Sequence, residues 1–227
     1  KNEEIAGIVG DLADLEMIYS FKSFFEKCIG SKNFECRQDK IYINPNERIN
    51  YIFNSSINGI EESDLILLVG TNPRLEATIL NARIRKAYVK NKVKVYSIGD
   101  PGELTYPYKN IGNSTSIIKD LDSGAGEIFF KIKKSKKPII IIGESALYGK
   151  TGEYIFETIK NFLIKNNFIR EDWNALNILT QQASRVGAID LGIYSIEENE
   201  NFSFFNKMKN DEFKFIFLLG ADNFNFD

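Results

Sequence analysis

Short, fully apolar runs that are each followed by a glycine constrain the fold of this chain more than any other feature. The three clearest are LILLV at 65–69, PIIII at 138–142 and FIFLL at 215–219. A strand that is apolar on both faces is typical of a parallel sheet covered by helices on each side. Because helix-length segments separate most of these runs, the pattern predicts βαβ units. The predicted fold class is α/β, with an open, mostly parallel, doubly wound, Rossmann-like sheet.

Periodicity and turn residues place the remaining elements. Asp11 is the predicted N-cap of the first helix and Gly30 its C-cap. The predicted strands are 5–9, 40–43, 65–69, 93–98, 138–142, one within 173–179, and 214–219. The predicted helices are 12–29, 75–90, 114–121, 124–134, 154–166 and 181–190.

Glycine follows several of the predicted strands in a repeated pattern. VGTN at 69–72, IGES at 142–145 and LGAD at 219–222 each combine the end of an apolar strand with glycine and a small or polar residue. Glycine lets the backbone turn sharply there, at the sheet edge where open α/β folds bind ligands. The pattern is weak by itself, because it also serves as plain turn chemistry. Neither GxGxxG nor GxxxxGK[ST] is present, which argues against a free-standing nucleotide-binding enzyme.

The residues available for chemistry exclude several classes of site. The chain has no histidine, so a histidine base, a catalytic triad and histidine-ligated metals are excluded within it. Its two cysteines cannot ligate an iron–sulfur cluster alone; we expect Cys28 half-buried on a helix and Cys36 exposed in a loop. We predict that the segment binds no metal and contains no catalytic residue. Ser145 has no histidine to activate it, and neither a partner base nor a set of metal ligands accompanies the carboxylate pairs Glu61-Glu62 and Asp120-Asp122.

Charge and hydropathy bear on the partners of the chain. Its formal net charge is -2, which provides no field that would recruit nucleic acid or an anionic membrane. No apolar run reaches the 18 residues of a transmembrane helix, so no direct membrane insertion is expected.

Two features near the end of the chain concern its packing. The aromatic residues Phe202, Phe204 and Phe205 are predicted to lie in the core. Because only GADNFNFD follows Leu219, we also expect the chain to be a fragment in which one apolar face of the final strand lacks its cover.

Longer segments resemble the family of the large iron–sulfur subunit of respiratory complex I, which is the 75 kDa subunit in mitochondria and has a bacterial counterpart in NADH–quinone oxidoreductase. The most specific segment is GTNPRLEATILNARIRK at 70–86. Others are GIVGDLADLEMIYSFKSFF, KVKVYSIGDPGELTYPY, KKPIIIIGESAL, WNALNILTQQASRVGAIDLG and FIFLLGADN, in the family's order along nearly all 227 residues.

This resemblance implies an assignment for the whole segment. It implies a fragment, 1–227, of the molybdopterin-oxidoreductase-like α/β region, with two subdomains at 1–135 and 136–227. The part of the parent that carries [2Fe–2S] and [4Fe–4S] clusters would lie upstream, and no molybdenum is expected. The segment would be a non-catalytic structural domain of NADH–quinone oxidoreductase, which passes electrons from NADH through FMN and clusters to quinone. Its partners would be the rest of its own subunit and other peripheral-arm subunits. The arm would lie at the cytoplasmic face of a bacterial inner membrane or, alternatively, on the mitochondrial matrix side.

The resemblance also singles out a vestigial pterin-site turn. In molybdopterin enzymes, turns like Gly70-Thr71-Asn72-Pro73 lie beside the nucleotide end of the cofactor. The Asp-Pro-Arg usual after the next strand is Asp100-Pro101-Gly102 here, which removes a bidentate phosphate contact. We therefore expect Gly70, Asn72, Pro73 and Asp100 to bind no cofactor. Instead, Asn72 should satisfy its own turn, Pro73 should start a helix, and Glu76 should complement the helix dipole. The alternative is an active molybdopterin oxidoreductase fragment that binds a pterin dinucleotide.

Overall fold

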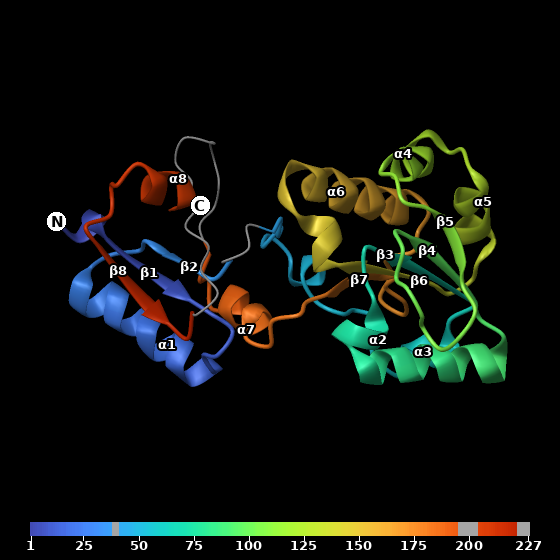
Figure 1. The fold of residues 1–227 in the computed structure, drawn as a ribbon, viewed down its shortest axis with the longest axis horizontal. Coiled ribbons are helices and arrows are strands. Elements are labelled where there is room, and N and C mark those ends of the chain that lie inside the picture. The colour runs from blue at the N-terminus through green and yellow to red at the C-terminus, as the bar shows by residue number, and fades with distance from the viewer. Residues whose placement is uncertain (38–40, 195–203, 222–227) are drawn as a thin grey trace. The chain divides into compact units, whose positions relative to one another are not determined.

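The computed structural model describes residues 1–37, 41–194 and 204–221, which belong to two compact units (Figure 1). The smaller unit combines Lys1–Lys40 with Gln182–Asp227, and the larger unit is Ile41–Gln181. This division differs from the subdomains expected at 1–135 and 136–227. The expected boundary falls within the larger unit, because strand β6 (Pro138–Gly143) pairs along its length with β3 (Leu65–Val69).

The larger unit is built on a five-stranded parallel sheet. Its order is β5-β4-β3-β6-β7, with β4 at Lys94–Ile98, β5 at Lys109–Gly112 and β7 at Leu176–Leu179. Leu65 is aligned with Lys94 on one side and with Pro138 on the other. The chain builds outward from β3 through β4 to β5, then returns to the other side of β3 for β6 and β7. The order therefore reverses between β3 and β6, which confirms the predicted doubly wound α/β class.

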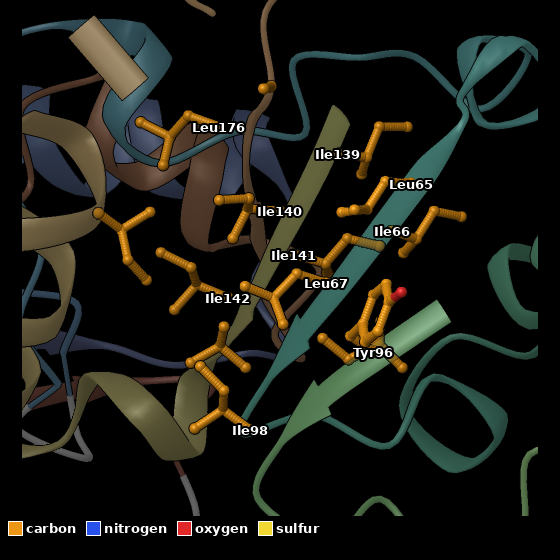
Figure 2. Close-up of a cluster of buried hydrophobic side chains, with 14 of the residues drawn as sticks. Leu65, Ile66, Leu67, Tyr96, Ile98, Ile139, Ile140, Ile141, Ile142 and Leu176 are labelled. Atoms are coloured by element: carbon orange, nitrogen blue, oxygen red, sulfur yellow. The ribbon is translucent and has the colours of Figure 1, made fainter. Parts of the chain in front are cut away.

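Helices cover both faces of this sheet, as the apolar strands require. Helices α2 (Pro73–Glu76) and α3 (Thr78–Asn91) lie on one side, and α4 (Ser116–Ser123) and α6 (Gly149–Lys165) lie on the opposite side (Figure 1). Helix α5 spans Glu127–Lys134. The central strands β3 and β6 lie side by side, and their apolar side chains, among them Leu67 and Ile141, belong to the buried core (Figure 2). In β6 the four isoleucines have no solvent exposure, so the sheet centre is fully desolvated.

The smaller unit contains a three-stranded parallel sheet. Its order is β2-β1-β8, with β1 at Ile5–Val9, β2 at Phe34–Glu35 and β8 at Phe215–Leu219. Helix α1 (Leu15–Phe24) continues into a π-helical turn at Phe25–Ile29, and the ring of Phe25 lies 5.6 Å from that of Phe217. The other helices described in this unit are α7 (Arg185–Asp190) and α8 (Phe204–Lys209). Phe204 and Phe205 are buried as predicted, whereas Phe202 lies outside the described residues.

Short elements account for most of the differences from the predicted pattern. Strands β2 and β5 were not predicted, and the expected strand at 40–43 is represented only by a bridge from Ile41 to Tyr148, with Lys40 outside the described residues. The expected helix at 75–90 is interrupted at Ala77, whose φ of -151° and ψ of 72° separate α2 from α3. Single 3-10 turns lie at Asn2–Glu4, Arg48–Asn50, Gly59–Glu62 and Glu144–Leu147.

Two local predictions about the smaller unit are wrong. The N-cap of α1 is Asp14, whose side chain accepts a hydrogen bond from the Met17 amide at 2.8 Å, and not Asp11. The exposures predicted for the cysteines are also wrong: Cys28, expected to be half-buried on a helix, is exposed in the π-helical turn, and Cys36, expected to be exposed, is buried. The pairing of β2 with β1 explains the second error, because it carries the residue after Glu35 into the interior.

No helix among the described residues combines the length and the apolar character needed to cross a bilayer.

Candidate functional site

The candidate site lies at the carboxyl edge of the larger sheet, where Gly70 follows β3, Gly99 follows β4 and Gly143 ends β6. A crevice of about 220 Å³ opens there beside the point where the strand order reverses. Parallel strands meet at one edge, so the glycine turns that are distant in sequence come together, as the repeated pattern indicates. The lining residues come from the ends of β3 and β4, the start of α4, the 3-10 turn Glu144–Leu147 after β6 and the start of α6. They are Val69, Gly70, Ile98, Gly99, Asn113, Ser114, Thr115, Ile118, Ser145, Ala146, Tyr148, Thr151 and Ile155.

The turn after β3 is closely covered by the turn after β6. Gly70 has a φ of +55°, in the left-handed region, and a Cβ added there would lie 2.7 Å from that of Ala146. The Ser145 hydroxyl donates a hydrogen bond to the Gly70 carbonyl. Gly143 in turn faces Gly70, because an added Cβ would lie 2.5 Å from the Gly70 carbonyl oxygen. The two turns therefore pack backbone against backbone, with no space between them for another group.

The polar atoms of residues 71–76 are used within the same turn. The Asn72 side chain accepts hydrogen bonds from the amides of Arg74 and Leu75, at 3.1 and 3.2 Å. The Glu76 carboxylate accepts from the Thr71 hydroxyl at 2.6 Å and from the Asn72 amide at 2.8 Å. Pro73 occupies the first turn of α2. The predicted local roles of Asn72 as a residue that satisfies its own turn and of Pro73 as the start of a helix are confirmed. Glu76 stabilises the same turn through its two hydrogen bonds.

Asp100 is engaged in the neighbouring turn after β4. Its carboxylate accepts from the Gly102 amide at 2.9 Å and from the Tyr108 hydroxyl at 3.3 Å. Desolvation and then the charge of Asp100 raise the pKa of the Tyr108 phenol above its ordinary value. Gly102 has a backbone φ of +67°, which an arginine residue would rarely adopt. The departure from Asp-Pro-Arg therefore suits the local backbone.

The structure brings the four predicted residues into two adjacent turns. Gly70, Asn72 and Pro73 share one turn, and a Cβ added to Gly102 in the turn of Asp100 would lie 3.8 Å from the side-chain nitrogen Nδ2 of Asn72. Sequence reasoning missed the role of Ser145 and Ala146 in covering Gly70. The signal was present, since IGES repeats the glycine pattern on a predicted parallel strand.

The glutamate pair at 61–62 is engaged in ion pairs on the surface. Glu61 pairs with Arg83 at 2.5 Å and with Lys86 at 2.7 Å, while Glu62 pairs with Lys137 at 2.5 Å. Hydrogen bonds from Lys86 and then Arg83 lower the pKa of Glu61 below its ordinary value. Within the part of the chain that the structure describes, no group of three or more acidic, cysteine or histidine side chains could hold a metal.

The fold and the crevice define a Rossmann-like α/β domain of the class whose ligands bind at the carboxyl edge of the sheet. Comparison with known families makes this more specific. The chain belongs to the molybdopterin oxidoreductase family, whose model matches residues 1–227.

Individual relatives are similar over nearly the whole chain. It is 40% identical to the NADH-ubiquinone oxidoreductase 75 kDa subunit of Reclinomonas americana, over 97% of this chain and 33% of that protein. It is 38% identical to the mitochondrial NADH-ubiquinone oxidoreductase 78 kDa subunit of Candida albicans, over 98% of this chain and 29% of that protein. It is 34% identical to NADH dehydrogenase [ubiquinone] iron-sulfur protein 1, mitochondrial, of Solanum tuberosum, over 100% and 29% respectively. The chain thus spans about a third of the length of these relatives.

Replacement of Gly70 tests the turn directly. We expect Gly70→Ala to lower the free energy of unfolding by roughly 1–3 kcal/mol, because of its positive φ and the contact with Ala146. The fluorescence of Trp173, the chain's one tryptophan and a buried residue of the larger unit, reports the transition. Gly149→Ala is the control, since Gly149 has a φ of +61° with nothing within 4 Å of an added Cβ. An unchanged midpoint for Gly70→Ala would contradict the prediction.

Proposed function

We propose that this chain is a non-catalytic structural domain of the large peripheral-arm subunit of NADH–quinone oxidoreductase. Relatives named as parts of NADH dehydrogenase or NADH-ubiquinone oxidoreductase match nearly the entire chain at 34–40% identity. The domain supports the cluster-bearing remainder of its own subunit and contacts neighbouring subunits. No step of the electron transfer is assigned to its side chains.

The observation that carries the structural role is the way the sheet edge is filled. Ser145 and Ala146 occupy the space against Gly70, and the polar groups of Asn72 and Asp100 are used in their own turns. The remaining crevice of about 220 Å³ is smaller than the roughly 300–1,000 Å³ typical of pockets for drug-sized ligands. A pterin dinucleotide exceeds that ligand size, so these residues do not fit the cofactor that the family name implies.

The second candidate is an active molybdopterin oxidoreductase fragment. The observations that favour it are the family match over residues 1–227 and the proximity of the two turns that hold Gly70, Asn72, Pro73 and Asp100. Under this candidate those turns would hold the nucleotide end of a pterin dinucleotide. The turn at Asp100-Pro101-Gly102 counts against it, because it provides no guanidinium for a phosphate.

The remaining assignments follow from membership in the enzyme. The [2Fe–2S] and [4Fe–4S] clusters belong to the rest of the subunit, and NADH and FMN belong to other subunits. The peripheral arm lies at the cytoplasmic face of a bacterial inner membrane; the alternative is the matrix side of the mitochondrial inner membrane. The relative from Solanum tuberosum is named as an iron-sulfur protein, which supports clusters in the parent.

The test uses the full-length subunit, tagged and produced in its own host. We expect it to purify with the other complex subunits and with NADH–quinone activity. Ser145→Ala and Asp100→Asn change the crevice, and we expect both to leave the electron-transfer rate per assembled complex unchanged. Normal assembly with a lost rate would show that the crevice takes part in the reaction and would contradict the non-catalytic role.

A further inference from the structure

The outward side of α3 carries apolar side chains that the larger unit does not bury. Ile79 is 72% exposed, Val89 is 56% exposed, and Ala82 between them is exposed as well. Spacings of three and seven residues align these side chains along one side of a helix. We refer to Ile79, Ala82 and Val89 as the α3 stripe. Leu75, on the short helix just before α3, is 79% exposed.

The α3 stripe is not required for packing within the larger unit. Helix α3 buries a different side, formed by Leu80, Asn81, Ile84 and Ala87. A single exposed apolar side chain is ordinary on a protein surface, but aligned ones indicate a contact surface. The stripe runs from Ile79 to Val89, which are ten residue steps apart, and this corresponds to about 15 Å along the helix axis. That length fits about three turns of a partner helix.

The charge beside the α3 stripe is positive. Arg85 follows Ala82 by three residues and precedes Val89 by four, so it lies next to both on the helix surface. Arg83 and Lys86 are both paired with Glu61. Arg85, in contrast, has no hydrogen bond or ion pair with any residue in the described part of the chain. Lys90 lies in the last turn of α3, where the helix dipole stabilises a positive charge. Arg85 lies in the middle of the helix, where the dipole gives its charge no such stabilisation.

We propose that the α3 stripe docks an acidic amphipathic helix of a neighbouring subunit. Apolar side chains at helical spacing on the partner would pack against Ile79 and Val89, as two helices do when their ridges interlock. A carboxylate beside that apolar side would meet Arg85 and select the orientation of the partner. The inference rests on the proposed function and assigns one face of this domain to one class of partner.

Photo-cross-linking in the assembled complex tests the proposal. A benzophenone side chain is placed at position 79 of the full-length subunit. The matched control is position 164, an isoleucine on α6 that is 53% exposed. From position 79 we expect a cross-link to a peptide of another subunit with apolar residues at helical spacing and flanking aspartate or glutamate.

Charge variants of Arg85 test the electrostatic part of the contact. Arg85→Glu should lower the yield of the cross-link from position 79 about tenfold or more, because it replaces attraction by repulsion. Arg85→Gln should lower this yield less, because it only removes the charge. Lys119→Glu, on the exposed side of α4, should leave the yield unchanged.

The outcomes separate this inference from the proposed function. A subunit that does not enter the complex overturns the proposed function. An assembled complex in which position 79 cross-links only to its own subunit, to a second copy or to lipid, or not at all, overturns this inference alone. An equal loss of yield with Lys119→Glu also overturns it, because the effect would then not depend on the α3 stripe. A Trp173 melting transition that is unchanged in each variant establishes that the larger unit is folded.

Discussion

Gly143→Ala should destabilise the larger unit by about 3 kcal/mol, at the upper end of the usual cost of an overpacked position. An added Cβ would lie 2.5 Å from the Gly70 carbonyl oxygen, 2.6 Å from the Thr71 Cβ and 3.1 Å from the Thr71 Cα. These atoms belong to the backbone turn after β3, which is held on its other side by the hydrogen bond from the Gly70 amide to the Ile98 carbonyl at 3.0 Å. The turn cannot move aside without disturbing the neighbouring strand, so the contact is costly.

The measurement is denaturant unfolding followed by Trp173 fluorescence, with Gly149→Ala as the control. Gly143 has a φ of -84°, so its replacement tests close approach without backbone strain, whereas Gly149 tests backbone strain without close approach. Gly143→Ala should therefore cost more than Gly149→Ala. Equal small effects at both positions would show that the turns after β3 and β6 are not in close contact.

Amide hydrogen exchange should be about 100-fold slower or more in β3 than in β8, because β3 exchanges only through large-scale opening. All five residues of β3 are buried, and β3 pairs with β4 on one side and β6 on the other. Strand β8 lies at the edge of its sheet, with β1 as its one paired neighbour among the described strands. Two of its apolar side chains, Phe215 and Leu218, are 54% and 50% exposed.

Strand β1 provides the internal control for this comparison. It shares a sheet with β8 but lies between β2 and β8, so its amides should exchange more slowly than those of β8. That difference separates the effect of the sheet edge from the stability of the smaller unit. Equal and near-global protection of β3 and β8 in a monomeric sample would mean that β8 is fully stabilised as it stands.

The strands that sequence reasoning located well are those with apolar residues on both faces. The predicted range 65–69 coincides with β3, and 138–142 differs from β6 by one residue, because desolvation of both faces leaves a continuous apolar run. The glycine turns were located because they follow these apolar runs, whereas the roles of Asn72 and Pro73 followed from the preferences of these residue types in turns and at helix starts.

The elements that escaped prediction are short, polar or dependent on distant residues. Strand β5 has the sequence KNIG and no buried residue, and β2 has two residues that pair with β1. The exposure of Cys36 depends on that pairing, so its own neighbours in sequence could not reveal it. The smaller unit joins both ends of the chain, which no local pattern encodes. Likewise, the contact of Ala146 with Gly70 depends on the register between β3 and β6.

We propose that the turns at the carboxyl edge of the larger sheet pack against each other and leave a crevice too small for a pterin dinucleotide, so that this edge binds no cofactor. The most direct test measures molybdenum by elemental analysis, and pterin by fluorescence after oxidative release, in the full-length subunit purified within its complex. We expect both to be far below one equivalent per subunit, whether Gly70, Asn72 and Asp100 are intact or replaced. One equivalent each of molybdenum and pterin in the wild-type protein, lost in Asp100→Asn, would contradict the claim.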